Sequence, residues 1–401
     1  MTRSPTKVAH VLTSIRDGGL ERVVLELCRG LPQDRFESEV CSLLDENPWS
    51  DIFINQKIPF RSFSARNRGG WRTVGTNMVA TVRLGAHFRR TRPDIVVVHD
   101  FFPGVLGRVA SMLGGGAQRV ATLHATYDWL DDTAGTINRW LGKRTRAIVC
   151  VSHAAMAASM SRDRLPSDLY RIVPNGVDAG KFRPDPEAGS ALRASLGWSD
   201  SEFIVGCVGV LRESKRQIDL VRAMAPLMAS DPSLRLVLVG SARLHEAESS
   251  KMLMESLDSL PPGRWNLVQD LREIAAYYNS FDMVSLPSES EGFGLVLAEA
   301  MASGKPCVVA DIPAHREVAS DTVLYHEPRD CGGIAQGILR LKTDAVLRAE
   351  LGVRARSVIE RKFTLNRMLE GWAAVLEDVR GTYGGTPQRR LSLGERTPLV
   401  P

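Results

Sequence analysis

The chain has 401 residues, 44% hydrophobic and 24% charged, with a net charge of +5. This length exceeds one ordinary core, so two or three domains of a typical globular composition are expected. No apolar stretch approaches the roughly 20 residues of a membrane-spanning helix, and the mild positive charge permits anionic partners without requiring them. The polar start indicates no signal peptide, and six cysteines without a CxxC pair indicate reduced thiols in a cytoplasmic protein.

In the first half, short β-branched apolar runs alternate with longer amphipathic ones, a pattern of strands and helices. Strands are expected at Val8–Thr13, Glu39–Leu43, Ile95–Val98, Arg119–Leu123 and Ala147–Val151, and helices include Leu20–Gly30 and Thr73–Arg90. One stretch in this half, Arg61 to Arg92, holds eight arginines and no acidic residue. A solvated face and contact with phosphates or an anionic membrane surface are both open readings, and nucleic acid is disfavoured because aromatic residues are sparse there.

The segment Ile172–Ala191 is rich in Pro, Gly, Asn and Asp, which predicts a linker between two domains. After it, strands are expected at Phe203–Val210, Arg235–Val239, Met283–Leu286 and Cys307–Ala310, with helices at Gln217–Ser230, Glu246–Ser259, Leu271–Ser280 and Leu295–Ser303. Continuous apolar strands between helices predict parallel sheets covered on both faces, so the fold class is α/β, doubly wound.

The end of the chain has its own pattern. Apolar residues recur at three- and four-residue spacing over Leu365–Val379, which predicts an amphipathic helix. The residues from 381 to 401 lack such periodicity and are expected to be disordered. We therefore expect a first domain over residues 1–178, a second over 179–363, and a further helix over 364–380.

In such folds ligands bind beyond the carboxyl ends of the strands, so the strand-to-helix loops are the candidate sites. Gly18 and Gly19 follow the first strand and allow a tight turn before a helix whose N–H groups can meet an anion. The absence of GxGxxG argues against a nicotinamide dinucleotide. His124 ends another strand, and His99, in a similar place, competes with it for a functional role.

Two loops of the second half carry charge. Arg212, Lys215 and Arg216 crowd a loop at the start of a helix, where cations are unfavourable unless an anion binds. In "SESEGFGLVLAEAMASGKP", Glu291 and Glu299 flank a glycine-rich helix start. The two carboxylates resemble a glycosidase acid–base pair. The amides at the helix start can bind a phosphate, and the nearby carboxylates can accept from hydroxyls. This combination instead favours a nucleotide sugar as the ligand.

Taken together, the motifs "GGLERVVLEL", "TLHATY", "IVPNGVD", "VGVLRESK" and "LPSESEGFGLVLAEAMASGKP" resemble those of retaining glycosyltransferases of family four (group 1), over about residues 7 to 380. Within that family the chain is most similar to enzymes of bacterial exopolysaccharide and cell-surface glycan synthesis. The resemblance implies the GT-B fold: two Rossmann-like domains facing across a cleft, the first for the acceptor and the second for the nucleotide sugar, with the last helix crossing back.

The resemblance also implies roles. Glu291 is expected to bind hydroxyls of the donor sugar, Glu299 the ribose, and His124 the sugar near the reacting carbon. Lys215 and the backbone amides around Phe293, Gly294 and Leu295 are expected to hold the diphosphate. Gly18 and Gly19 are expected to line the phosphate or acceptor side of the cleft, and Gly292 completes the donor-binding residues. The family pattern G-R-L-x-x-x-K has Val210 in place of its arginine here, and Arg212 is expected to supply that cation.

The implied reaction is retaining transfer from a UDP-, GDP- or ADP-sugar to a hydroxyl of a glycan or lipid-linked acceptor. No D-x-D triplet occurs, so neither a metal nor another cofactor is expected. The basic stretch allows a peripheral position on the inner face of the plasma membrane. A nucleotide-sugar epimerase of the same fold, and a binding protein with a dead site, are the alternatives.

Overall fold

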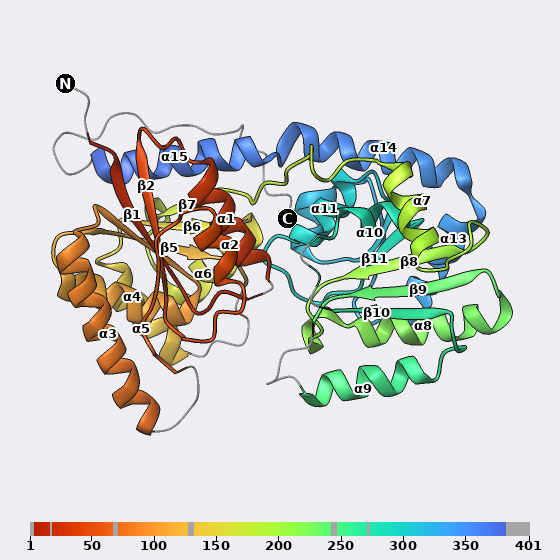
Figure 1. Cartoon of the computed structure of the whole chain (residues 1–401), viewed down its shortest axis with the longest axis horizontal. Helices are drawn as coiled ribbons and strands as arrows, with labels where there is room; N and C mark the ends of the chain where they lie inside the picture. Colours follow the sequence, from red (N-terminus) through yellow and green to blue (C-terminus); the bar gives the residue numbers. More distant parts are fainter. Residues whose placement is uncertain are drawn as a thin grey trace.

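The computed structural model describes residues 4–16, 18–66, 71–126, 132–241, 247–269, 271 and 273–381. Figure 1 shows two α/β units, the first in red to yellow and the second in green to cyan, with the long helices α14 and α15 running along the top of both. Each unit contains one parallel sheet. The predicted doubly wound α/β class is confirmed.

The first sheet has seven strands in the order β3-β2-β1-β4-β5-β6-β7. Its middle strand β4 is wholly buried, because helices cover both faces of the sheet and leave no face for water. The elements of this half are β1 (Thr6–Leu12), α1 (Gly19–Gly30), β2 (Phe36–Ser42), α2 (Ser50–Asn55), β3 (Phe60–Ser62), α3 (Trp71–Thr91), β4 (Ile95–His99), α4 (Phe101–Gly114), β5 (Gln118–Leu123), α5 (Asp132–Gly142), β6 (Ala147–Cys150), α6 (His153–Asp163), a 3₁₀ turn (Ser167–Leu169) and β7 (Tyr170–Ile172).

The second sheet has six strands in the order β10-β9-β8-β11-β12-β13. The largest apolar core of the described residues surrounds it. Its elements are α7 (Pro186–Ser195), β8 (Phe203–Val208), a 3₁₀ turn (Glu213–Lys215), α8 (Gln217–Ser230), β9 (Leu234–Val239), α9 (Ala247–Asp258), β10 (Trp265–Val268), α10 (Ala275–Ser280), β11 (Met283–Leu286), α11 (Leu295–Ala302), β12 (Cys307–Ala310), α12 (Pro313–Ala319), β13 (Leu324–His326), α13 (Cys331–Thr343) and α14 (Ala345–Lys362).

The chain passes between the two units twice, and the two crossings are hydrogen-bonded to each other. The amide of Val177 donates to the carbonyl of Phe363 at 2.8 Å, and the amide of Leu365 donates to the carbonyl of Val177 at 2.9 Å. Gly176 fits because a Cβ there would lie 2.5 Å from the carbonyl oxygen of Thr364. After this crossing α15 (Leu365–Gly381) packs its apolar stripe on the first sheet, as predicted for the returning helix.

Several sequence-based boundaries were wrong in detail. The four strands that the sequence did not predict, β3, β7, β10 and β13, are all sheet edges of three or four residues. An edge strand has one neighbour and less need for apolar residues, so its signal is weak. Strand β8 ends at Val208 instead of Val210 because Gly209 has a φ of +146°. Helix α10 begins at Ala275 rather than Leu271, and the expected tail lies outside the described residues.

Two other expectations concern membranes and thiols. Among the helices described, none is long and apolar enough to span a bilayer. All six cysteines are free, five of them are buried, and Cys331 is partly exposed. Burial raises the pKa of Cys28, Cys150 and Cys207 to about 12, which keeps these thiols protonated and unreactive.

Candidate active site between the two domains

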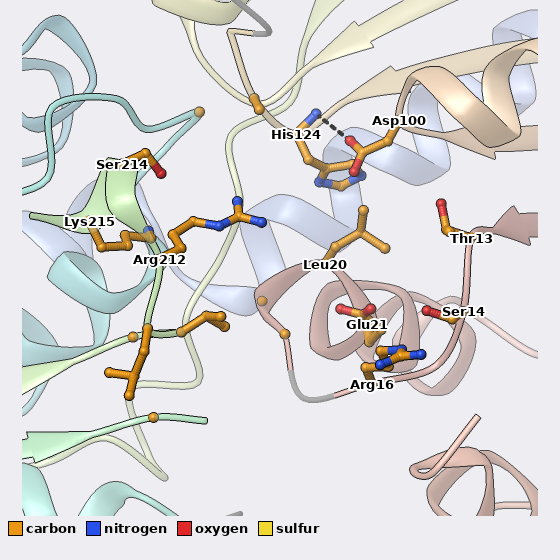
Figure 2. A pocket seen from close by; sticks show the side chains of 18 of the residues that line it. Thr13, Ser14, Arg16, Leu20, Glu21, Asp100, His124, Arg212, Ser214 and Lys215 are labelled. Carbon is orange, nitrogen blue, oxygen red and sulfur yellow. Dashed lines mark hydrogen bonds between the residues drawn. The ribbon is translucent and has the colours of Figure 1, made fainter. Parts of the chain in front are cut away.

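The carboxyl ends of the two sheets open onto one cleft, lined from both domains. Its volume of about 2610 Å³ exceeds the roughly 300–1,000 Å³ of a site for one small ligand. The cleft therefore has room for two substrates. Figure 2 shows its two walls, with Lys215 and Arg212 on the second-domain side and His124, Asp100 and Glu21 on the first-domain side.

Lys215 and Glu291 form an ion pair in the second-domain wall. Lys215 lies in the loop after β8 and Glu291 in the loop after β11, and their Nζ and Oε1 atoms are 2.5 Å apart. Burial opposes the charge of Glu291, but Lys215, His315 and a hydrogen bond from Ser288 outweigh it and lower its pKa. Glu291 is therefore an ionised hydrogen-bond acceptor at neutral pH and unsuited to act as a general acid.

The N-terminus of α11 lies next to this pair. Gly294 is its N-cap with a φ of +86°, a left-handed conformation that favours glycine. The first amides of the helix, beginning at Leu295, line the cleft and suit an anion. His315 stands behind Gly294: its Nδ1 bonds the carbonyl of Ala310 at 2.8 Å, and its buried Nε2 has no partner among the described residues.

Gly292 and Phe293 both line the cleft, and each also has a packing role. A Cβ on Gly292 would lie 1.9 Å from the carbonyl oxygen of His124, so this glycine serves the close approach of the two domains. Its own carbonyl accepts a hydrogen bond from Ser152 of the first domain. The side chain of Phe293 is buried against Phe363, with ring centroids 5.4 Å apart, so only its backbone is available to a ligand.

Glu299 is nearly buried on α11 and also lines the cleft. Its Oε2 accepts a hydrogen bond from the hydroxyl of Tyr278 at 2.9 Å, and its Oε1 is 4.0 Å from Nη1 of Arg22, a first-domain residue on α1. Burial, followed by the nearby charge of Glu299, raises the pKa of Tyr278 well above its usual value, so Tyr278 stays a donor. Groups from both domains therefore contact the carboxyl group of Glu299.

The glycine pair and Arg212 also reach the cleft. A Cβ on Gly19 would lie 3.3 Å from Cδ2 of Leu295, so the loop before α1 faces the N-terminus of α11 across the gap. Gly18 lines the same gap. Figure 2 shows the guanidinium of Arg212 extending toward the first-domain wall. Arg212 therefore stays the candidate for the cation that Val210 does not supply.

His124 is the first-domain group opposite these residues. Its Nε2 lies 3.0 Å from Nδ1 of His99, and its backbone amide lies 3.4 Å from Oδ1 of Asp100. Burial lowers the pKa of His124 to about 4, so the imidazole is neutral at pH 7. The expectation that His99 competes with His124 was wrong, because the structure places the two side chains in contact, with His99 behind His124.

Comparison with known proteins matches both halves of the chain. Residues 17–181 match the family model described as Glycosyltransferase Family 4, and residues 190–358 match Glycosyl transferases group 1. A D-inositol 3-phosphate glycosyltransferase of Stackebrandtia nassauensis is 31% identical over 331 residues, which cover 76% of this chain and 71% of that protein.

The chain belongs to glycosyltransferase family 4. Another relative is the UDP-Gal:alpha-D-GlcNAc-diphosphoundecaprenol alpha-1,3-galactosyltransferase of Escherichia coli, 24% identical over 86% of this chain and 90% of its own. The crystal structure of Anabaena HepE in complex with UDP and glucose superposes with a TM-score of 0.83, at 22% identity, over 93% of this chain and 99% of that one. The similarity to HepE shows the GT-B fold. The family models and the Stackebrandtia relative show that the protein is a glycosyltransferase.

Several cleft residues of the transferase escaped the sequence-based reasoning, among them Asp100, Glu21 and Arg22. Asp100 has a φ of 73° and a ψ of 178°, a conformation that is essentially restricted to glycine. Such strain is typical of functional positions, and nothing in the sequence around Asp100 signals it. Glu21 and Arg22 stand in the quoted motif "GGLER", so their position next to the two glycines was a usable signal.

The transferase has one cluster of three possible metal ligands among its described residues, formed by Glu39, Cys41 and His87. None of them lines the cleft. His87 Nε2 lies 2.9 Å from a carboxylate oxygen of Glu39, and Arg90 Nη2 lies 3.3 Å from His87 Nδ1. Both ring nitrogens of His87 therefore have protein partners, and the cluster lies outside the cleft.

Proposed function

We propose that the protein catalyses retaining, metal-independent transfer of a sugar from a nucleotide-diphosphate sugar to a hydroxyl of a glycan or lipid-linked acceptor. The observation that carries the proposal is the convergence on one cleft of the α11 N-terminus, the Lys215–Glu291 pair and His124. The first two come from one domain and His124 from the other. This arrangement gives the diphosphate and the sugar separate places.

On the donor side, a diphosphate fits at the start of α11, where the amides from Leu295 onward and Lys215 carry positive potential. Glu299 lies one helical turn further on and is suited to accept from two ribose hydroxyls. Glu291 precedes the helix and is placed to accept from hydroxyls of the sugar. The repulsion between a carboxylate and a phosphate is relieved for Glu291 by its bond to Lys215.

The chemistry follows from these charges. As the sugar–phosphate bond breaks, negative charge grows on the diphosphate, and Lys215, Arg212 and the helix amides are placed to stabilise it. Glu291, which is expected to face the sugar, is ionised and paired with Lys215, so it is suited neither to donate a proton nor to attack as a nucleophile. The acceptor hydroxyl attacks on the face from which the diphosphate departs, and the departing phosphate takes its proton.

The donor is identified by a panel of UDP-, GDP- and ADP-sugars in a thermal-shift assay. Binding at 100 times Kd stabilises the native state by about 2.7 kcal/mol, so the preferred donor is expected to raise Tm by several degrees. The anomeric configuration of the product, read by proton NMR, tests retention, and full activity in EDTA tests metal independence. Consumption of the donor without an acceptor would favour the epimerase, and binding without any turnover would favour the dead-site protein.

The acceptor side suggests a membrane. Along α3, Val74, Met78 and Val82 are 56%, 65% and 56% exposed at four-residue spacing, which makes one apolar stripe. Figure 1 shows the first turns of α3 projecting beyond the body of the first domain. Six arginines of the basic stretch are exposed on or near this helix, and none has a carboxylate partner among the described residues: Arg61, Arg66, Arg83, Arg89, Arg90 and Arg92.

We propose that this surface, the α3 stripe with its arginines, rests on an anionic membrane and brings a lipid-linked acceptor to the cleft. Two relatives act on such acceptors by name, a diphosphoundecaprenol and a phosphatidylinositol monomannoside. Co-sedimentation with anionic phospholipid vesicles is expected at low salt and lost at high salt. Replacing Val74, Met78 and Val82 by Ser is expected to abolish it. Equal binding of the triple variant, or of neutral vesicles, would contradict the proposal.

A further inference from the structure

A row of three histidines crosses the first sheet behind the active site. His10 lies on β1, His99 ends β4 and His124 follows β5. The register pairs His10 with Val97 and His99 with Thr122, so each histidine stands two residues further along its strand than the last. All three side chains therefore share one face of the sheet, since side chains alternate along a strand.

The three rings are joined by two hydrogen bonds. His10 Nδ1 lies 3.1 Å from His99 Nε2, and His99 Nδ1 lies 3.0 Å from His124 Nε2. His10 and His99 have no exposed surface, and Trp372 of α15 covers His99 with a ring-centroid distance of 6.4 Å. His124 lines the cleft, so the row leads from the buried centre of the sheet to the reaction site.

This geometry couples the protonation of all three rings. A neutral imidazole has one N–H and one bare nitrogen. Burial lowers the pKa of His10 and of His124 to about 4 and that of His99 well below its ordinary value, so each ring has one N–H at pH 7. His99 can donate to only one neighbour and must accept from the other. The row therefore has two states. In one, each ring donates to the next ring nearer the cleft; in the other, each ring donates to the next ring further from the cleft.

The far end of the row selects between these states. His10 Nε2 is buried and has no partner among the described residues. If the bonds point away from the cleft, this atom carries a proton with no acceptor. If they point toward the cleft, it is a bare nitrogen. Unpaired buried donors are rarer in proteins than unpaired buried acceptors, so the direction toward the cleft is favoured.

We propose that His10 and His99 are positioning residues that hold His124 as the Nδ1–H tautomer, so that it presents a hydrogen-bond donor to an oxygen of the bound sugar. In this state His10 Nδ1 donates to His99, and His99 Nδ1 donates to His124 Nε2. His124 Nε2 is then occupied and its proton is on Nδ1. His124 orients a sugar hydroxyl or ring oxygen and does not take up a proton. This role rests on the proposed sugar-transfer function, whereas the tautomer itself is independent of it.

The tautomer is measured without a substrate. The full chain is labelled with ¹⁵N at its eight histidines, and a long-range ¹H–¹⁵N spectrum separates protonated from bare ring nitrogens. Loss of single signals in His10, His99 and His124 variants assigns the rings. We expect all three rings of the row to carry their proton on Nδ1 at pH 7. A proton on Nε2 of His124 would overturn the proposal, whatever the activity of the protein.

Two variants of His99 test the positioning role. In His99→Asn the amide nitrogen takes the place of Nδ1 and still donates to His124, whereas His99→Leu fills similar volume without a donor. We expect His99→Leu to lower kcat by about tenfold, as for one lost hydrogen bond, with the KM for the nucleotide sugar unchanged and the His124 signals moved. His99→Asn is expected to restore most of the kcat and the His124 pattern.

His87→Leu is the matched control, because it removes a buried histidine of the same domain outside the cleft. Equal kcat in His99→Leu and His99→Asn, together with an unchanged His124 spectrum, would reduce His99 to a packing role and overturn the proposal. If no nucleotide sugar binds even the unmodified protein, the proposed function fails. In that case the spectrum alone decides whether His124 is the Nδ1–H tautomer.

Discussion

The second domain lines the cleft with the Lys215–Glu291 ion pair (the charged wall). The first domain presents a neutral histidine backed by two more (the neutral wall), beside Glu21, Arg22 and Asp100, which also line the cleft. On the charged wall, Lys215 binds Glu291, and Glu299 is held by Tyr278. On the neutral wall, burial lowers the pKa of His124 to about 4. The difference fits the proposed function, in which Lys215 stabilises the leaving diphosphate and His124 presents a neutral donor to the sugar.

The largest effect is expected from breaking the charged wall. Lys215→Ala and Glu291→Ala are each expected to lower kcat/KM by about 10²–10³-fold, the size of a lost transition-state contact. Each also leaves its partner without a counter-charge in a poorly exposed site, which costs about 3–5 kcal/mol of stability. The double variant Lys215→Met, Glu291→Leu is expected to recover stability in urea unfolding but not activity.

Arg329→Ala is the control for that pair, because Arg329 and Glu289 form an exposed ion pair, with Arg329 61% exposed. Little change in stability is expected there, as for most surface pairs. Full activity in either Lys215→Ala or Glu291→Ala would remove these residues from the site.

Acid tests the neutral wall. The unfolded chain binds protons at its histidines near pH 6.5, but His10 and His124 of the native state do so only near pH 4. Their stabilising contribution is complete above pH 6.5 and is lost as the pH falls toward 4. Each histidine is expected to contribute up to about 3 kcal/mol to the free energy of unfolding over this pH range. Urea unfolding between pH 7 and pH 4.5 measures it, and His10→Leu is expected to flatten the slope. If the unfolding free energy of that variant depends on pH as in the unmodified protein, the histidine row does not cause the pH dependence.

Contact between the walls is tested at Gly292. Gly292→Ala places a methyl group within 1.9 Å of the His124 carbonyl oxygen, so the walls must separate. A shift of this size is expected to lower kcat by about 10- to 100-fold with a small change in Tm. Gly381→Ala is the control, because no described residue lies within 4 Å of a Cβ added there. Unchanged kinetics of Gly292→Ala would show that the transferase works with the domains further apart.

The sequence predicted the charged wall better than the neutral one. Glu291, Glu299 and Lys215 stand in motifs whose residue types and spacing are specific to their chemistry, and the structure places all three at the cleft. The histidine row depends on the register between β1, β4 and β5, which joins residues 10, 99 and 124 and which no local pattern encodes. The backbone strain at Asp100 was not predicted for a similar reason, because a backbone conformation set by tertiary packing has no sequence signature.

The smallest effect is expected from a single hydrogen bond on the charged wall. Tyr278→Phe removes the hydroxyl that donates to Oε2 of Glu299 but keeps the ring packed in the core. Glu299 keeps its charge and Arg22 stays near Oε1, so the carboxylate loses orientation more than it loses function. The affinity for UDP, GDP or ADP is expected to fall by about two- to fivefold in calorimetry, about the size of one indirect contact. Tyr277→Phe is the matched control, since its neighbouring ring is also buried and its hydroxyl does not bond Glu299. An equal loss in both variants would assign the effect to packing, and no loss in Tyr278→Phe would show that the Tyr278 hydroxyl does not orient Glu299.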